Sequence, residues 1–128
     1  MRRMLMLVAI AGLLAAALLV GCTENADPAT ITVIMRNTSQ KPASLWLGHG
    51  DPDAQALVAP GGMRGVSVTV KRFLTGSRLF ISDKLRANAK TSDGAATDST
   101  IAFERDYHDG FQYYITWDGK SFSGALTP

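Results

Sequence analysis

From Thr30 onward, the dominant pattern in the chain is a one-by-one alternation of apolar and polar residues. Because successive side chains of a β-strand point to opposite faces of a sheet, this period is typical of strands with one buried face. The segments that show it are Ile31–Arg36, Ser44–Leu47, Gly65–Lys71, Arg78–Ser82, Thr100–Glu104 and Phe111–Trp117. Several short strands in succession predict an all-β domain over residues 30–128, a small and mostly antiparallel β-sandwich.

Turn residues separate these segments. The Pro-Gly-Gly sequence at 60–62 combines the fixed φ of proline with a glycine that accepts positive φ, which predicts a type II turn. The Asp-Gly pair at 118–119 is typical of a two-residue hairpin turn, here between strands at 111–117 and 120–125. A polar turn after the first strand, then Pro-Gly and an alternating strand, resembles the immunoglobulin-like sandwich. The resemblance implies that type of fold and no particular function.

Two segments do not show the alternation. Residues 82–98 are polar and rich in Ala and Lys, and we expect a long exposed excursion with at most a helical turn or two. Residues 22–29 are short, polar and interrupted by Pro28, which predicts a flexible tether in front of the domain.

The beginning of the chain has a different composition. Arg2 and Arg3 precede Met4–Val20, an uncharged apolar run of 17 residues. A basic start followed by such a run is typical of a secretory signal, here residues 1–21. An uncleaved transmembrane anchor is the alternative, and 17 residues are at the short end for spanning a bilayer.

The apolar run ends in Leu19-Val20-Gly21-Cys22, which resembles the bacterial lipobox. The resemblance implies that a diacylglyceryl group is attached to the thiol of Cys22 and that the chain is cut just before it. This covalent lipid is the only cofactor that we expect, and it implies an anchor in the cell membrane. The residue after the cysteine is Thr23 rather than Asp, which by the rule for that family favours the outer membrane, facing the periplasm, in a Gram-negative host.

Charge excludes one class of partner. Of the 13 Lys and Arg residues, Arg2 and Arg3 belong to the signal, which leaves 11 basic residues against 11 acidic ones. A neutral domain lacks the positive field that nucleic-acid binding needs, so we expect no nucleic-acid partner. Because Cys22 is the only cysteine, the domain has no disulfide and depends on its apolar core.

Two loops carry the candidate metal ligands. His49, Asp51 and Asp53 lie in one loop and His108 in another, and imidazole with carboxylates is a ligand set for divalent ions. A metal site or a metal-dependent enzyme at these residues is one hypothesis. Gly, Pro and Asp are also ordinary constituents of solvated turns, which is the other interpretation.

Aromatic side chains suggest a binding surface. Trp46, Phe80 and Tyr114 occupy the strand positions opposite the main apolar alternation. If these positions align, the rings form a strip for stacking on carbohydrate or peptidoglycan sugars; otherwise they pack in the domain. Basic side chains that could hold an anionic envelope polymer, or simply be solvated, are Arg36, Arg64, Lys71, Arg72 and Arg78.

No catalytic constellation is recognisable in the sequence. We therefore expect a lipid-anchored protein of the bacterial cell envelope that is not an enzyme and works as a binding or assembly module. Its expected partners are the membrane, through the lipid, and an unidentified envelope protein or polymer. The metal-dependent enzyme and the carbohydrate-binding module are the two alternatives.

Overall fold

The computed structural model describes residues 23–126, and these form eight strands and no helix. The all-β prediction is confirmed. The predicted signal segment and Cys22 lie outside the described residues. The strands are β1 (Thr23–Asn37), β2 (Ala43–Leu47), β3 (Leu57–Val58), β4 (Met63–Thr75), β5 (Arg78–Thr91), β6 (Ala96–Asp106), β7 (Gln112–Trp117) and β8 (Phe122–Ala125).

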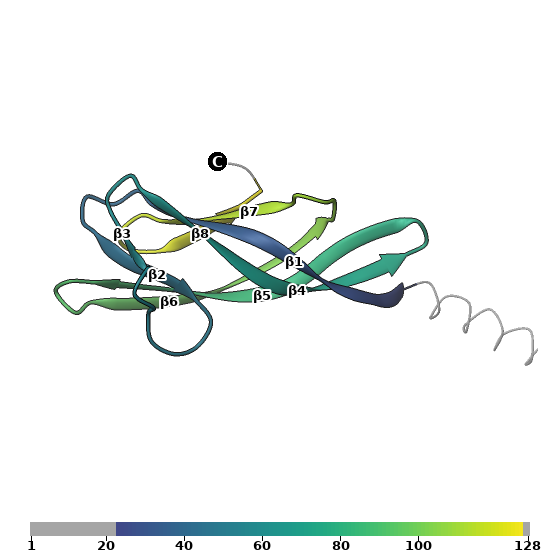
Figure 1. The fold of residues 1–128 in the computed structure, drawn as a ribbon, viewed down its shortest axis with the longest axis horizontal. Helices are drawn as coiled ribbons and strands as arrows, with labels where there is room; N and C mark the ends of the chain where they lie inside the picture. Colours follow the sequence, from purple (N-terminus) through teal and green to yellow (C-terminus); the bar gives the residue numbers. More distant parts are fainter. Residues whose placement is uncertain (1–22, 127–128) are drawn as a thin grey trace, which may run out of the picture.

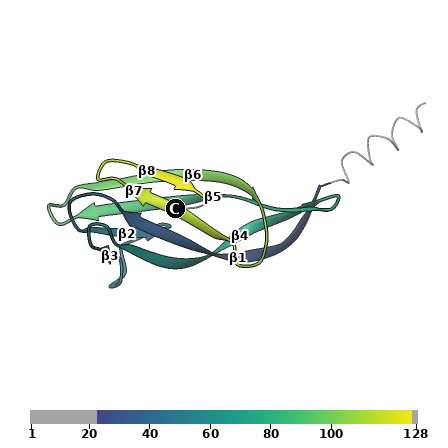
Figure 2. The same ribbon diagram turned by 90° about the horizontal axis from the view of Figure 1, so that it is seen from above.

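The strands form one continuous sheet that is bent into two layers (Figures 1 and 2). Their order is β3-β2-β5-β4-β1-β7-β8, and β6 pairs with the other edge of β5. The pair β1–β7 is parallel and the remaining pairs are antiparallel. β4 and β5 are joined by only four residue pairs, Arg72–Thr75 with Arg78–Ile81, so the two layers separate beyond them. The result is a small β-sandwich whose mostly antiparallel sheet contains one parallel pair.

The core lies between the two layers. Ile31, Val33 and Met35 of β1 are buried, as the alternation predicts. Phe103 of β6 stacks on Tyr113 of β7 with ring centroids 4.9 Å apart, which joins the layers directly. Each large apolar side chain buried in this way stabilises the fold by about 1.5–3 kcal/mol.

Residues 82–98 are a correction to the sequence prediction. They are not an exposed excursion but belong to β5 and β6, which pair along 11 consecutive positions from Phe80–Asp106 to Lys90–Ala96. A tight turn joins the strands, with Gly94 at φ +88° and the N–H of Thr91 donating to the carbonyl of Ala95 over 3.0 Å. This hairpin supplies half of one layer.

The predicted tether is a second correction. Residues 23–29 are the first part of β1, where Thr23 pairs with Thr75 and Ala26 with Arg72. The register shifts between Ala26 and Ala29, a bulge that contains Pro28. A bulge is where a strand tolerates a residue without an N–H. The described part of the chain is therefore strand from Thr23 onward and contains no separate tether in front of β1.

The turn predictions are largely confirmed. In residues 59–62 the N–H of Gly62 donates to the carbonyl of Ala59 over 2.8 Å and Gly61 has φ +75°, the pattern of a type II turn. The hairpin after Trp117 forms as predicted, but its loop has four residues instead of two, because Trp117 pairs with Phe122.

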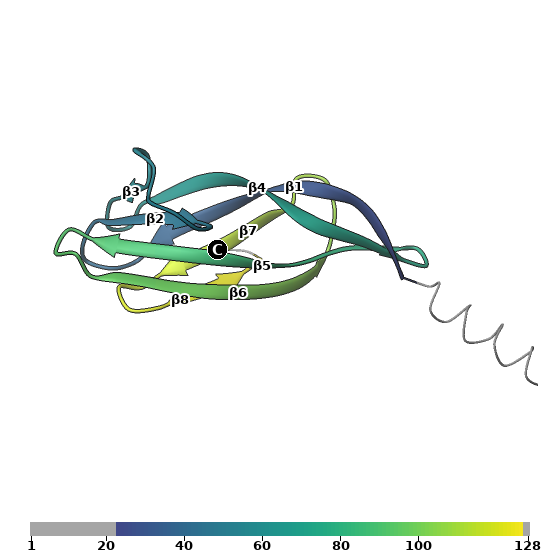
Figure 3. The same ribbon diagram turned by 90° about the horizontal axis from the view of Figure 1, so that it is seen from below.

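The domain is elongated (Figure 1). One pole carries the N-terminal end of β1 and the turn between β4 and β5 (Figure 3). The turn between β5 and β6 lies at the opposite pole.

Candidate functional site

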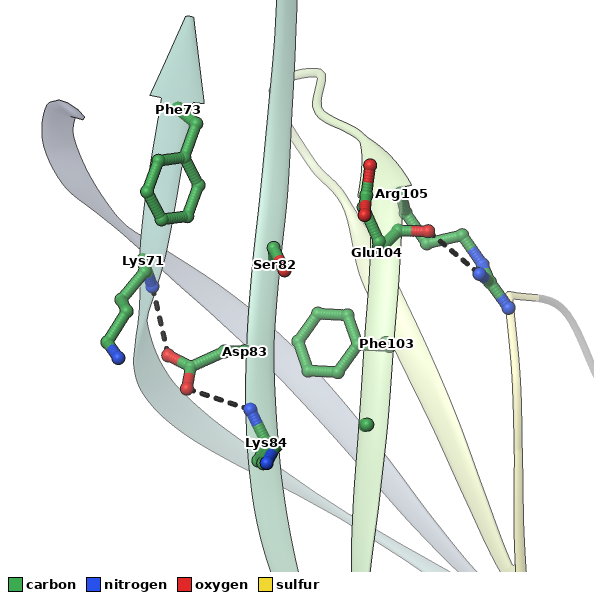
Figure 4. Close-up of a pocket in the computed structure, with 9 residues that line it drawn as sticks. Lys71, Phe73, Ser82, Asp83, Lys84, Phe103, Glu104 and Arg105 are labelled. Carbon is green, nitrogen blue, oxygen red and sulfur yellow. Dashed lines mark hydrogen bonds between the residues drawn. The ribbon is translucent and has the colours of Figure 1, made fainter. Parts of the chain in front are cut away.

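A groove opens where β4 and β5 separate. Beyond the pair Arg72–Ile81, β4 continues along β1, whereas β5 continues toward β2 and pairs with it from Ala87 onward. In the described part of the chain, no strand pairs with residues 82–85 of β5 on the β4 side, and the carbonyl of Arg86 accepts the N–H of Gly48 over 2.8 Å. The space there has a volume of about 710 Å³ (Figure 4). The residues that line it are Lys71, Phe73, Ser82, Asp83, Lys84, Ala102, Phe103, Glu104 and Arg105.

Asp83 holds the two diverging strands together. One carboxylate oxygen accepts the N–H of Lys71 in β4 over 3.0 Å, and the other accepts the N–H of Lys84 over 2.8 Å. Figure 4 shows this carboxylate between the two strands. A side chain thus satisfies backbone donors at the point where the strand ladder ends. Asp83 forms no ion pair with the ammonium group of Lys71 or of Lys84.

The residues that line the groove include three basic and two acidic side chains. Within residues 23–126 the ammonium groups of Lys71 and Lys84 have no ion pair. The acid opposite them, Glu104, pairs with Arg78 over 3.5 Å, and the guanidinium of Arg105 donates to the carbonyl of Glu104 over 2.8 Å. Both lysines are exposed and available to an anionic ligand.

Aromatic rings form the apolar part of the groove. Phe103 comes from the buried face of β6, and Phe73 stacks on Phe80 with centroids 5.5 Å apart. The groove therefore offers cations next to apolar surface, which suits a ligand that carries both acidic and apolar groups.

A smaller hollow of about 290 Å³ continues along β5 toward β2. Lys84 lines both spaces, and Arg86 and His49 close the far end. The guanidinium of Arg86 pairs with Asp98 over 2.9 Å and lies 3.0 Å from Nδ1 of His49. Because a guanidinium can only donate, this contact requires the proton of a neutral His49 to be on Nε2.

The predicted metal ligands do not converge. His49 contacts Arg86, Asp53 pairs with Arg64 over 3.2 Å, and His108 packs edge-on against Phe111. The hydrogen bond from Arg64 holds the pKa of the Asp53 carboxyl below its usual value. Asp51 is exposed. Over residues 23–126 no three His, Cys, Asp or Glu side chains are grouped so that they could hold a metal ion, and the four candidates are not brought together.

The predicted aromatic strip is not formed. Phe80 is buried against Phe73, with the guanidinium of Arg78 4.6 Å from its ring centroid. Trp46 pairs with Asn88, eight residues farther along β5, about 26 Å away at the usual rise per residue. Tyr114 lies on β7, three strands from β5 in the sheet order. The three rings therefore pack in separate places.

The basic residues singled out in the sequence have different surroundings. Arg64 and Arg78 form ion pairs, and Arg36 and Arg72 lie over the rings of Tyr114 and Tyr107. Lys71 alone of the five lines the groove. Asp83, Lys84, Phe103 and Arg105 were not identified from the sequence, because their proximity depends on where β4 and β5 separate.

Within the described range, no helix is long and apolar enough to cross a membrane. No protein-family model matches the chain, and comparisons with curated proteins and with solved structures likewise give no significant match.

Proposed function

We propose that this chain is a lipid-anchored protein of the bacterial cell envelope whose β-domain is a non-catalytic binding module. The lipobox sequence at 19–22 supports the anchor. The groove between β4 and β5 supports the binding role, because it combines apolar surface with two exposed lysines that form no ion pair within residues 23–126.

The ligand that this groove suits is an extended acidic segment of another envelope protein. Lys71 and Lys84 supply the complementary charge, and residues 82–85 of β5 lack a strand partner on this side. An extended peptide can add to such an edge through its main chain while side-chain contacts select it. Exposed charge pairs contribute only about 0.2–1 kcal/mol each. Binding is therefore weak for a free domain, and the anchor compensates by raising the local concentration of the module.

The anchor is tested by growing cells with labelled palmitate. We expect label on the wild-type chain and none on Cys22→Ser, which removes the acceptor thiol. A wild-type chain that stays unlabelled and retains residues 1–21 would refute lipidation.

The groove is tested with a pair of charge-reversed variants. A fluorescent peptide of alternating Asp and Val residues serves as the probe, and anisotropy at low salt gives its dissociation constant. Lys71→Glu with Lys84→Glu should weaken binding about tenfold or more, because two attractive contacts become repulsive. Lys90→Glu with Lys120→Glu makes the same charge change at exposed lysines outside the groove and should have little effect. Equal weakening in both variants would mean that the groove does not hold the peptide.

The same position identifies the natural partner. A photo-crosslinking residue in place of Lys84 should give a protein adduct in intact cells that the residue in place of Lys120 does not give. Adducts with cell-wall polymer alone, or identical adducts at both positions, would contradict an acidic protein segment as the ligand.

A further inference from the structure

The first described residue of the chain, Thr23, lies next to the β4–β5 turn. Thr23 pairs with Thr75, the last residue of β4, and the turn residues Gly76 and Ser77 follow at once. Paired strand residues are about 5 Å apart, so Thr23, which follows the proposed lipid attachment site Cys22 in the sequence, lies beside this turn. β1 begins at this pole of the domain, as Figure 3 shows.

The hairpin at this pole has an unusual composition. Residues 71–82 contain three basic residues and no acidic one. They also contain five large apolar residues, which are Phe73, Leu74, Leu79, Phe80 and Ile81. Leu74 is 37% exposed; it pairs with Leu79 across the hairpin and with Glu24 of β1 on its other side.

We infer that the tip of this hairpin, residues 74–78, lies in the headgroup region of the bilayer that holds the anchor. The inference rests on the proposed lipidation of Cys22 and adds an orientation and a second membrane contact. The glyceryl group of the anchor lies at the edge of the hydrocarbon, and each headgroup layer is only about 5–8 Å thick. Thr23 directly follows the proposed anchor in the sequence and pairs with Thr75, so the turn is held within reach of the headgroups.

The side chains at the tip suit that environment. Long basic side chains beside apolar ones extend toward lipid phosphates while their stems stay on apolar surface. Arg72 lies over the ring of Tyr107 at 5.3 Å and donates to the backbone carbonyl of Asp27, so its charge has no carboxylate partner among the described residues. Arg78 is different, because Asp106 and Glu104 both pair with it. Arg72 and Leu74 are thus the residues expected to contact lipid.

A spin label measures the depth of the tip. Once Cys22 is acylated, Ser77→Cys supplies the single free thiol, and Asp93→Cys does so in the turn at the opposite pole. The lipidated full chain is inserted into vesicles of phosphatidylethanolamine and phosphatidylglycerol. We expect the label at 77 to be relaxed mainly by lipid-soluble oxygen and the label at 93 mainly by a water-soluble nickel complex. Equal relaxation by the nickel complex at both positions would overturn the inference.

A second substitution tests the lipid contact itself. Leu74→Glu replaces a half-exposed apolar residue by a charge and should move the label at 77 toward water, while the acyl chains keep the protein on the vesicles. The corresponding control, Leu57→Glu, changes an exposed leucine of β3 and should leave the label at 77 unchanged. Mass spectrometry separates the two proposals: a chain without acyl groups contradicts the proposed anchor, whereas an acylated chain with a water-exposed tip contradicts only this orientation.

Discussion

Asn37 is a single polar side chain that fixes the end of β1. It is fully buried, and its Nδ2 donates to the carbonyls of Lys41 and Val58 over 2.8 and 2.9 Å. Its Oδ1 accepts the N–H of Ser39 over 3.0 Å. The side chain therefore forms hydrogen bonds with the turn after β1, at Ser39 and Lys41, and with Val58 of β3. A buried amide is stable only with such partners.

Replacing this residue should be costly. Asn37→Ala leaves the carbonyls of Lys41 and Val58 without this donor, and we expect a loss of about 2–4 kcal/mol in the free energy of unfolding. Urea denaturation followed by circular dichroism measures it. Asn25→Ala, at an exposed position of β1, is the matched control and should cost less than about 1 kcal/mol. Similar losses in both variants would show that the turn does not depend on the amide.

Asp83 is expected to stabilise the domain in a different way. Each of its two oxygens accepts one backbone N–H, so Asp83→Asn turns one acceptor into a donor that faces another donor. We expect a loss of about 1–3 kcal/mol, the usual range when hydrogen bonds to a charged group are lost. The comparison is Asp51→Asn, which makes the same change at an exposed loop position. An unchanged urea midpoint in Asp83→Asn would mean that β4 and β5 stay together without this bridge.

At the scale of the elements, β8 packs closely against Tyr113 of β7 because it has a glycine, Gly124, at the point of contact. A Cβ at Gly124 would collide with the ring and hydroxyl of Tyr113, which is nearly fully buried and cannot easily move. Gly124→Ala should therefore destabilise the domain by about 1–3 kcal/mol, the usual cost of overpacking. Gly65→Ala is the control, since a Cβ there meets Ile34 and Thr32 at ordinary distances of 3.6 and 3.7 Å. A thermal unfolding midpoint that falls equally in both variants would contradict this account of β8.

The loop between β7 and β8 should respond to acid. The N–H groups of Ser121 and Lys120 donate to the Asp118 carboxylate and lower its pKa. Because the folded-state pKa is below the unfolded value of about 3.9, this stabilisation is complete above about pH 4 and is lost as the pH falls through the folded pKa. Asp118→Asn resembles the protonated acid, so the stability gap between wild type and variant should be largest at neutral pH and close toward about pH 3. A gap that does not change with pH in urea titrations would exclude this role for the carboxylate.

The strands were predictable from the sequence where large apolar residues mark the buried face. Alternating Val and Ile residues reveal β1 and β4, and aromatic ones reveal β7. The sequence did not predict the second half of β5 as a strand. Its buried positions include Ala87 and Ala89, which contribute little apolar signal and favour helix by propensity. These alanines are small because Leu47 and Leu45 of β2 lie directly across from them. The sequence did not predict the start of β1 as a strand either. This segment is polar and contains Pro28, which the strand accommodates in the bulge between Ala26 and Ala29.

The groove was not predictable for a related reason. The sequence shows that Lys71 is charged, but it does not show that Lys71 and Lys84 line one groove. That arrangement depends on the point, after Ile81, at which β4 and β5 separate. That parting is set by long-range pairing, with β1 on one side and β2 on the other. Alternation shows which face of a strand is buried and contains no information about where two neighbouring strands separate.

At the scale of the whole molecule, the groove lies on the same half of the domain as Thr23, the residue that follows the proposed anchor. Lys71 and Asp83 are about six residues from the β4–β5 turn, which places the groove roughly 20 Å from that turn along the strands. If the turn lies among the headgroups, the groove opens close to the membrane and the β5–β6 turn points away from it. A partner segment that extends along the membrane surface would then reach the groove more readily than one that approaches from the opposite pole.

This arrangement predicts the effect of a longer connection to the anchor. Because residues 23–29 are strand rather than tether, inserting about ten Gly and Ser residues between Cys22 and Thr23 should leave the fold and its urea midpoint unchanged. Such an insert has an end-to-end distance of about 17 Å, enough to lift the β4–β5 turn out of the headgroup layer. The spin label at 77 should then become as accessible to the nickel complex as the label at 93.

Removing residues 23–28 should instead destabilise the domain, because β4 loses its pairing partner next to the turn. A deletion that leaves stability unchanged would mean that this part of β1 contributes nothing to the fold. In that case residues 23–28 would not hold the β4–β5 turn in a fixed position relative to the proposed anchor.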